Sequence, residues 1–143
     1  MSDGYNYIGG RRSGLGAVLL SSIDAHSGEP LPGFFYQATD TEVDAAAQAA
    51  ATAYPGYRAL APERRACFLE AIADELDALG GDFIALVGRE TALPAPRVNG
   101  ERGRTSGQLR LFAQVLRRGD YLGARIDRAL PQRQPLPRPD LRQ

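Results

Sequence analysis

Residues 39–56 read TDTEVDAAAQAAATAYPG and give the clearest indication of the architecture. Thr39 and Glu42 have the spacing of a capping box, in which each side chain accepts a hydrogen bond from the other residue's backbone N–H. This spacing predicts a helix that begins at about Asp40 and ends at Pro55-Gly56. Apolar residues recur at helical spacing and predict a closely packed, mostly alanine face: Val43, Ala46, Ala47, Ala50 and Tyr54.

Three more helices are predicted on the C-terminal side of the first. Pro62 suits the first turn of a helix, where its missing N–H costs nothing, and Gly80-Gly81 end that helix. The apolar stripe of this second helix consists of Leu69, Ile72, Ala73, Leu76 and Leu79. Asp82 is expected to cap a third helix that runs to about Thr91, and Val98–Arg118 forms a longer fourth helix.

Short strands are predicted before the first helix, at Tyr5–Ile8, Val18–Ile23 and Phe34–Gln37. They cannot bury a face by themselves, so they need another layer to cover them. After the fourth helix a strand is expected at Ala124–Leu130, and the prolines that follow favour an extended connector. These prolines are spaced four, two and two residues apart, so the P-x-x-P pattern of an SH3 ligand does not occur.

The order of these elements predicts a mixed α/β fold that makes up the N-terminal part of an incomplete domain. Residues 1–39 are expected to form strands or arms, and residues 40–119 about four helices. Residues 120–143 are expected to form a strand and an extended, proline-rich connector. No internal repeat is found, which argues against a solenoid.

The composition excludes several classes of function. Seventeen basic residues balance seventeen acidic ones, so no broad positive field is predicted to hold nucleic acid or a membrane. Every basic residue is arginine, and Schiff-base and P-loop chemistry both need a lysine amine. No apolar run approaches the roughly 18 residues of a membrane helix, and no export signal is recognised. A single cysteine cannot form an internal disulfide, so a reducing cytoplasm is the expected compartment.

Neither Cys67 nor His26 is predicted to be catalytic. A reactive thiol needs a base beside it, but Cys67 falls nearly opposite the stripe of its helix, and His26 lies some forty residues away among turn-forming residues. One histidine and one cysteine cannot supply a zinc site, whereas a carboxylate-only magnesium site stays open. Gly14-Leu-Gly16 begins a dinucleotide-binding fingerprint, but position 19 is leucine, so no cofactor-binding residue is predicted.

The densest polar cluster is Gly100–Gln108. It offers guanidinium, hydroxyl and amide donors to a carboxylate, from Arg102, Arg104, Thr105 and Gln108. The alternative is that its glycines let another helix approach closely while its arginines face solvent. Both interpretations stay open.

Read in order, nine stretches of the chain resemble the N-terminal portion of the aldehyde dehydrogenase superfamily. The nearest branch is that of the α-ketoglutaric semialdehyde dehydrogenases. The stretches are Tyr5–Gly10, Ser27–Glu29, Ala38–Ala46, Tyr57–Arg65, Phe68–Glu75, Glu90–Pro94, Gly100–Thr105, Gly107–Ala113 and Pro135–Arg142. Two positions depart from the family pattern: Cys67 stands where alanine is common, and Ala61 where serine is common.

The resemblance implies oxidation of an aldehyde to a carboxylic acid with NAD or NADP. In this family the cysteine nucleophile, the glutamate base and the cofactor-binding residues follow the proline-rich connector. No catalytic, cofactor-binding or metal-binding residue is therefore carried over to this chain. The resemblance makes Arg104, Thr105 and Gln108 candidates to bind the distal carboxylate of an acidic aldehyde. It also implies that residues 124–130 join an oligomerisation sheet.

Two functions are compatible with these expectations. In the first, the chain is the N-terminal fragment of an aldehyde dehydrogenase and is inactive alone, and its partner is the remainder of that polypeptide. In the second, it is a non-catalytic assembly remnant that binds intact, homologous dehydrogenase subunits through apolar faces and edge strands. A small self-sufficient enzyme is disfavoured because a nucleophile, a base and a metal set are all missing.

Overall fold

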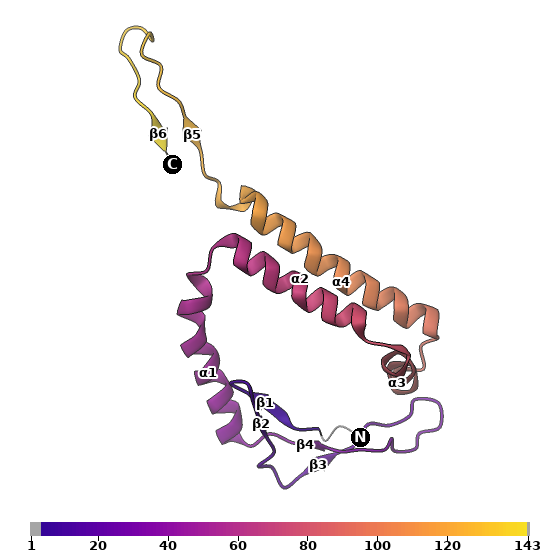
Figure 1. The fold of residues 1–143 in the computed structure, drawn as a ribbon. Helices are drawn as coiled ribbons and strands as arrows, with labels where there is room; N and C mark the ends of the chain where they lie inside the picture. The colour runs from indigo at the N-terminus through magenta and orange to yellow at the C-terminus, as the bar shows by residue number, and fades with distance from the viewer. Residues whose placement is uncertain (1–3, 143) are drawn as a thin grey trace.

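A computed structural model describes residues 4–142 and confirms the mixed α/β architecture, with short strands and four α-helices. Figure 1 shows the four helices between a small N-terminal strand region and a C-terminal arm that points away from them. The elements in chain order are β1 Asn6–Ile8, β2 Arg11–Ser13, β3 Leu19–Leu20, β4 Phe35–Tyr36, α1 Asp40–Arg58, α2 Pro62–Ala78, α3 Gly81–Thr91, α4 Ala95–Arg118, the 3₁₀ turn η1 Asp120–Leu122, β5 Ile126–Asp127 and β6 Leu141–Arg142.

The N-terminal strands form two small antiparallel sheets. Strands β1 and β2 pair around Gly9 and Gly10, whose φ angles of 56° and 79° suit a tight hairpin turn. Strand β3 pairs with β4. Strand β2 was not predicted, because Arg11 and Arg12 lack the apolar alternation that marks a strand. The two glycines were the available signal for this hairpin.

Helix α1 begins as predicted but ends later. The capping box is complete: Glu42 N–H donates to the Thr39 hydroxyl at 3.3 Å, and Thr39 N–H donates to the Glu42 carboxylate at 2.9 Å. The predicted stop at Pro55-Gly56 is wrong, because α1 continues to Arg58 and the N–H of Ala59 still bonds to the Pro55 carbonyl at 3.1 Å. A proline removes only its own N–H bond, so the last turn can still form around it.

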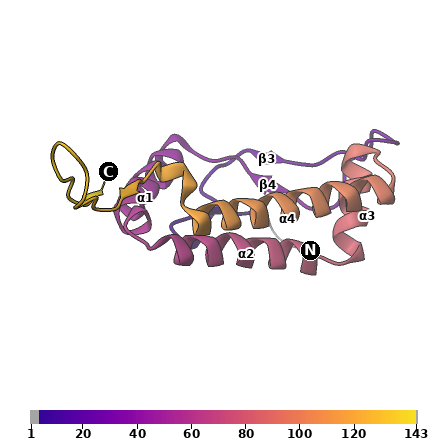
Figure 2. The same cartoon turned by 90° about the horizontal axis from the view of Figure 1, so that it is seen from above.

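Helices α2 and α4 pack side by side as an antiparallel hairpin (Figures 1 and 2). Their seam contains three alanines with no exposed surface, Ala66 and Ala73 from α2 and Ala113 from α4. Such small side chains allow a close approach of the two backbones. The predicted α2 stripe is therefore correct at Ala73, while Leu79 at the end of the helix remains exposed.

The predicted starts of α3 and α4 are each displaced by a few residues. Helix α3 begins at Gly81 with Gly80 as its N-cap, so Asp82 lies inside the first turn and does not cap it. Helix α4 begins at Ala95, three residues earlier than expected, because Pro96 lies in the first turn where a missing N–H breaks no bond.

The C-terminal residues differ from a simple extended connector. Strand β5 lies inside the predicted range 124–130, but the chain then turns back and β6 pairs with β5. An isolated bridge between Leu130 and Arg138 extends this pairing. Prolines without N–H donors between the strands are compatible with such a two-stranded arm, because its outer edges need no partner strand.

The molecule has little core and a large surface. Among the described residues, the buried apolar side chains are Leu31, Ala66, Ala73, Ile84, Val98 and Ala113. The predicted close packing of the α1 alanine face is wrong within this chain, since Val43 and Tyr54 are 57% and 58% exposed. The accessible surface is 11030 Å², against about 7,200 Å² for a compact monomer of 15.4 kDa. Much apolar surface is therefore uncovered.

Within residues 4–142, no helix is both long enough and apolar enough to cross a membrane.

Candidate functional site

The three predicted substrate-binding residues all lie on the exposed side of α4. Arg104 and Gln108 are one helical turn apart, so their side chains project from the same face. Thr105 is adjacent, but its hydroxyl donates to the Glu101 carbonyl of its own helix at 2.9 Å. Among the described residues, neither the Arg104 guanidinium nor the Gln108 amide has a hydrogen-bond partner. These two groups are therefore available to an external ligand.

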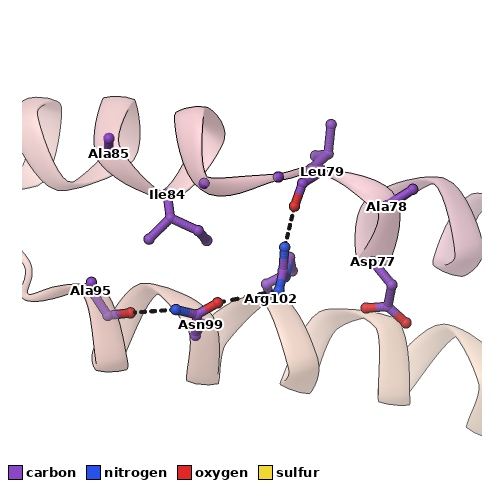
Figure 3. A pocket seen from close by; sticks show the side chains of 10 residues that line it. Asp77, Ala78, Leu79, Ile84, Ala85, Ala95, Asn99 and Arg102 are labelled. Carbon is purple, nitrogen blue, oxygen red and sulfur yellow. Dashed lines mark hydrogen bonds between the residues drawn. The ribbon is translucent and has the colours of Figure 1, made fainter.

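Arg102, the fourth donor of the cluster, points elsewhere. Its guanidinium donates to the Leu79 carbonyl at the end of α2 and to the Asn99 side chain at 3.2 Å (Figure 3). In this position it borders an open cavity of about 570 Å³ between the α2–α3 turn and α4. Ile84 and Ala85 of α3 and Ala95 of α4 also line that cavity. Arg102 therefore joins α4 to the end of α2, whereas Arg104 and Gln108 are exposed on α4.

The glycines of α4 face open space. A Cβ atom added to Gly100, Gly103 or Gly107 would meet no atom within 4 Å. The interpretation that these glycines admit another helix is therefore not realised within the described chain. The exposed side of α4 that carries Arg104 and Gln108 stays uncovered.

Two arginines of α4 form ion pairs along α2 that the sequence analysis did not predict. Arg117 bonds to Glu63 at 2.9 Å and to Glu70 at 2.5 Å, and these hydrogen bonds are the main cause that lowers the pKa of both carboxyls. Arg110 bonds to Asp74 at 2.7 Å and to Asp77 at 2.8 Å. Partners separated by 33 to 54 residues leave no periodic signal in the sequence. These pairs connect α4 to α2 at two places along the antiparallel contact.

Cys67 and His26 lie in different surroundings. The Cys67 thiol is exposed, and its Sγ lies 3.4 Å from Glu63 Oε1 and 4.0 Å from Arg117 Nη2. His26 lies in a turn, where its backbone N–H donates to the Asp24 carboxylate at 3.0 Å. Cys67 thus lies on α2, and His26 lies in the loop between β3 and β4. Within residues 4–142, no cluster of three or more histidine, cysteine, aspartate or glutamate side chains is arranged to hold a metal.

Glu42 has a second role beyond its capping box. Its side chain is buried, with 3% exposure for the residue. It accepts hydrogen bonds from the Ser13 hydroxyl at 2.5 Å and from the Leu15 N–H at 3.2 Å, in addition to those from Thr39. The bond from Ser13 is the main cause that lowers the pKa of Glu42 to about 2. The residue thus ties the N-terminal hairpin to the first turn of α1.

Residues 19–136 of the chain match the aldehyde dehydrogenase family. An α-ketoglutaric semialdehyde dehydrogenase of Acinetobacter baylyi is 49% identical over 142 residues, covering 99% of this chain and 27% of that relative. An α-ketoglutaric semialdehyde dehydrogenase 2 of Azospirillum brasilense is 48% identical over 136 residues, covering 94% of this chain and 26% of that relative. The chain thus spans about a quarter of the length of both relatives.

The fold is also similar to a solved structure. A crystal structure of an NAD-dependent benzaldehyde dehydrogenase from Corynebacterium glutamicum superimposes with a TM-score of 0.76 at 19% identity. The alignment covers 94% of this chain and 28% of that one. The similarity therefore extends over nearly all of the described elements.

Proposed function

The chain belongs to the aldehyde dehydrogenase family, and from this premise we propose that it is the N-terminal part of an NAD(P)-dependent enzyme that oxidises an aldehyde to its carboxylic acid. It is inactive until the remaining polypeptide is supplied. The observation that carries this proposal is the match over residues 19–136 together with coverage of only about a quarter of the relatives. The uncovered apolar surface supports it, because a complete domain buries such surface.

Inactivity of the chain alone follows from the chemistry of its side chains. Oxidation by this family needs a thiolate held near a base and a bound nicotinamide, which accepts the hydride when present. The exposed Cys67 thiol donates a 3.4 Å hydrogen bond to the Glu63 carboxylate, which is itself held by Arg117 and is not offered as a free base. The nucleophile, the base and the cofactor site are therefore assigned to the remaining polypeptide, and either NAD or NADP is compatible with the proposal. A reducing cytoplasm is the proposed compartment.

The proposed substrate is α-ketoglutaric semialdehyde, which carries a carboxylate and a ketone at the end opposite the aldehyde. The guanidinium of Arg104 suits a bidentate pair with that carboxylate, and the Gln108 amide can donate to the neighbouring ketone oxygen. Thr105, the third predicted residue, instead lines a small cavity with Phe83 and Val87 of α3. The names of the two relatives in Acinetobacter and Azospirillum support this choice of substrate.

A second candidate is a non-catalytic module that assembles with intact dehydrogenase subunits. The C-terminal arm favours it, because β5 and β6 form a two-stranded ribbon to which no third strand of residues 4–142 pairs. Ile126 and Leu136 on this arm are 73% and 72% exposed. Co-purification of the chain with an intact relative, without any gain of activity, is the result that this candidate requires.

A fused enzyme tests the proposed function. This chain replaces the aligned stretch of the Acinetobacter relative, and the purified fusion is assayed for reduction of NAD or NADP with several aldehydes. We expect oxidation of α-ketoglutaric semialdehyde and a lower kcat/KM for benzaldehyde, which lacks the distal carboxylate. The chain by itself serves as the inactive control. A folded fusion that prefers benzaldehyde would refute the substrate assignment.

A further inference from the structure

Arg97 and Glu101 form an ion pair on the exposed side of α4, beside the candidate substrate site. Arg97 Nη2 lies 2.6 Å from Glu101 Oε1, and the two residues are one helical turn apart. At about 100° per residue, Arg97, Glu101 and Gln108 all project within about 60° of the direction of Arg104. The pair therefore shares a face with the two donors that are proposed to bind the substrate.

Glu101 is the only acidic residue of α4, and it lies one helical turn from Arg104. Side chains three and four residues apart are neighbours on a helix. The four such positions around Arg104 are Gly100, Glu101, Gly107 and Gln108. The two glycines have no side chain, and the glutamine carries no charge. Glu101 is thus the one group of α4 that could neutralise the guanidinium of Arg104.

The Glu101 carboxylate has two cations within reach and pairs with one of them. Arg97 lies four residues before it and Arg104 three residues after it, so either guanidinium can meet it. The pair forms with Arg97, and Arg104 has no ion-pair partner within residues 4–142. The side chains of Arg97 and Glu101 are 64% and 45% exposed, so an exchange of partners would need no change in packing. Which arginine Glu101 chooses is therefore decided by these few charges.

We infer that Arg97 is a positioning residue for the proposed substrate site. It holds the Glu101 carboxylate and so keeps the guanidinium of Arg104 free for the distal carboxylate of the aldehyde. Arg97 also offsets the negative charge of Glu101, which would otherwise repel that carboxylate. An aldehyde without a carboxylate gains from neither effect. This inference rests on the proposed function.

Kinetics of the fused enzyme test the inference. Arg97→Gln releases Glu101 and should raise KM for α-ketoglutaric semialdehyde about two-fold or more at low salt, while kcat and KM for benzaldehyde stay the same. The ratio of the variant and parental KM values should shrink at high salt, which screens exposed charges. Arg97→Lys, which keeps a positive partner for Glu101, should give a smaller rise than Arg97→Gln.

A second substitution distinguishes positioning from direct binding of the substrate by Arg97. Glu101→Gln in the Arg97→Gln background removes the released carboxylate and should return KM to the parental value. A double variant that keeps the raised KM overturns the inference, because Arg97 would then bind the substrate itself. The matched control is Arg118→Gln, which breaks the exposed pair with Asp120 at the far end of α4 and should leave KM unchanged.

The outcomes separate this inference from the proposed function. An unchanged KM in Arg97→Gln, or equal rises for both aldehydes, overturns the role of Arg97, while an active fused enzyme leaves the function standing. A folded fusion that oxidises no aldehyde refutes the function, and the inference falls with it. An unchanged KM in Arg104→Ala refutes the substrate site and removes the group that Arg97 is inferred to keep free.

Discussion

The Ser13 hydroxyl donates a 2.5 Å hydrogen bond to the carboxylate of Glu42, a residue 29 positions further along the chain. This bond connects the end of β2 to the first turn of α1. Because Glu42 also completes the capping box with Thr39, one buried carboxylate fixes both the start of the helix and its contact with the hairpin. The orientation of α1 against the hairpin depends on this junction.

The charge of Glu42 makes stability depend on acidity. Its pKa falls from 4.5 to about 2 on folding, so its contribution is fully present above pH 4.5 and is lost as the pH falls through about 2. Glu42→Gln should lower the free energy of unfolding at neutral pH and flatten its decline across this window. Urea unfolding at several pH values measures this. Glu29→Gln, at an exposed loop glutamate, is the control, and an equal effect of the two variants would contradict the assignment.

The hydroxyl of Thr39 stabilises the helix start. Thr39→Ala removes the acceptor for the Glu42 N–H and should cost about 1 kcal/mol, within the usual range for loss of an N-cap. Thr41→Ala, two residues on and exposed inside the helix, should be neutral or slightly stabilising because alanine favours helix. Denaturant titrations of both variants measure the change in the free energy of unfolding. A larger loss for Thr41→Ala would show that the cap is not the critical contact.

The ion pairs of Arg117 should give the α2–α4 hairpin a measurable salt dependence. Arg117 bonds to both Glu63 and Glu70, whereas Arg118 forms one exposed pair with Asp120 at 3.1 Å. Arg117→Gln should lower the melting temperature more than Arg118→Gln, and should also reduce the response of the melting temperature to added salt. Thermal scans at low and high salt test this. Identical salt responses of the melting temperature in the two variants would contradict a contribution of the Arg117 ion pairs to stability.

The exposed donors on α4 should affect substrate choice in a fused enzyme. Arg104→Ala should raise KM for α-ketoglutaric semialdehyde about ten-fold or more, through loss of charge-assisted hydrogen bonds, while kcat changes little. KM for benzaldehyde should stay the same because it has no carboxylate to bind. Arg118→Ala, at the far end of α4, is the control. A parallel loss with both aldehydes would mean that Arg104 supports the structure and does not select substrate.

Local signals predicted the start of α1, the order of the four helices and the turn that contains His26. Each depends on residues a few positions apart, as with Thr39 and Glu42. The end of α1 was missed because Pro55 prevents only its own N–H bond, and β2 was missed because its residues are polar. At the end of α1 and in β2, backbone hydrogen bonds extend the helix and form the strand although the side-chain pattern does not predict either.

Contacts between residues that lie far apart in the sequence could not be predicted. Arg102 was grouped with Arg104 because the two are neighbours on α4, but the fold places it against the Leu79 carbonyl. The ion pairs of Arg117 and the second role of Glu42 likewise require that separate elements be brought together. The exposed face of α1 was predicted as packed because its periodicity shows that a face is apolar, but not whether the covering layer lies in the same chain.

Oxidation of α-ketoglutaric semialdehyde by the fused enzyme tests the central claim most directly. The unmodified Acinetobacter relative and this chain alone are assayed in parallel, with NAD and with NADP. The account predicts that the fusion restores nicotinamide reduction to a rate comparable with that of the parent enzyme, while this chain alone gives none. A soluble, folded fusion without activity, or activity of this chain alone, would contradict it.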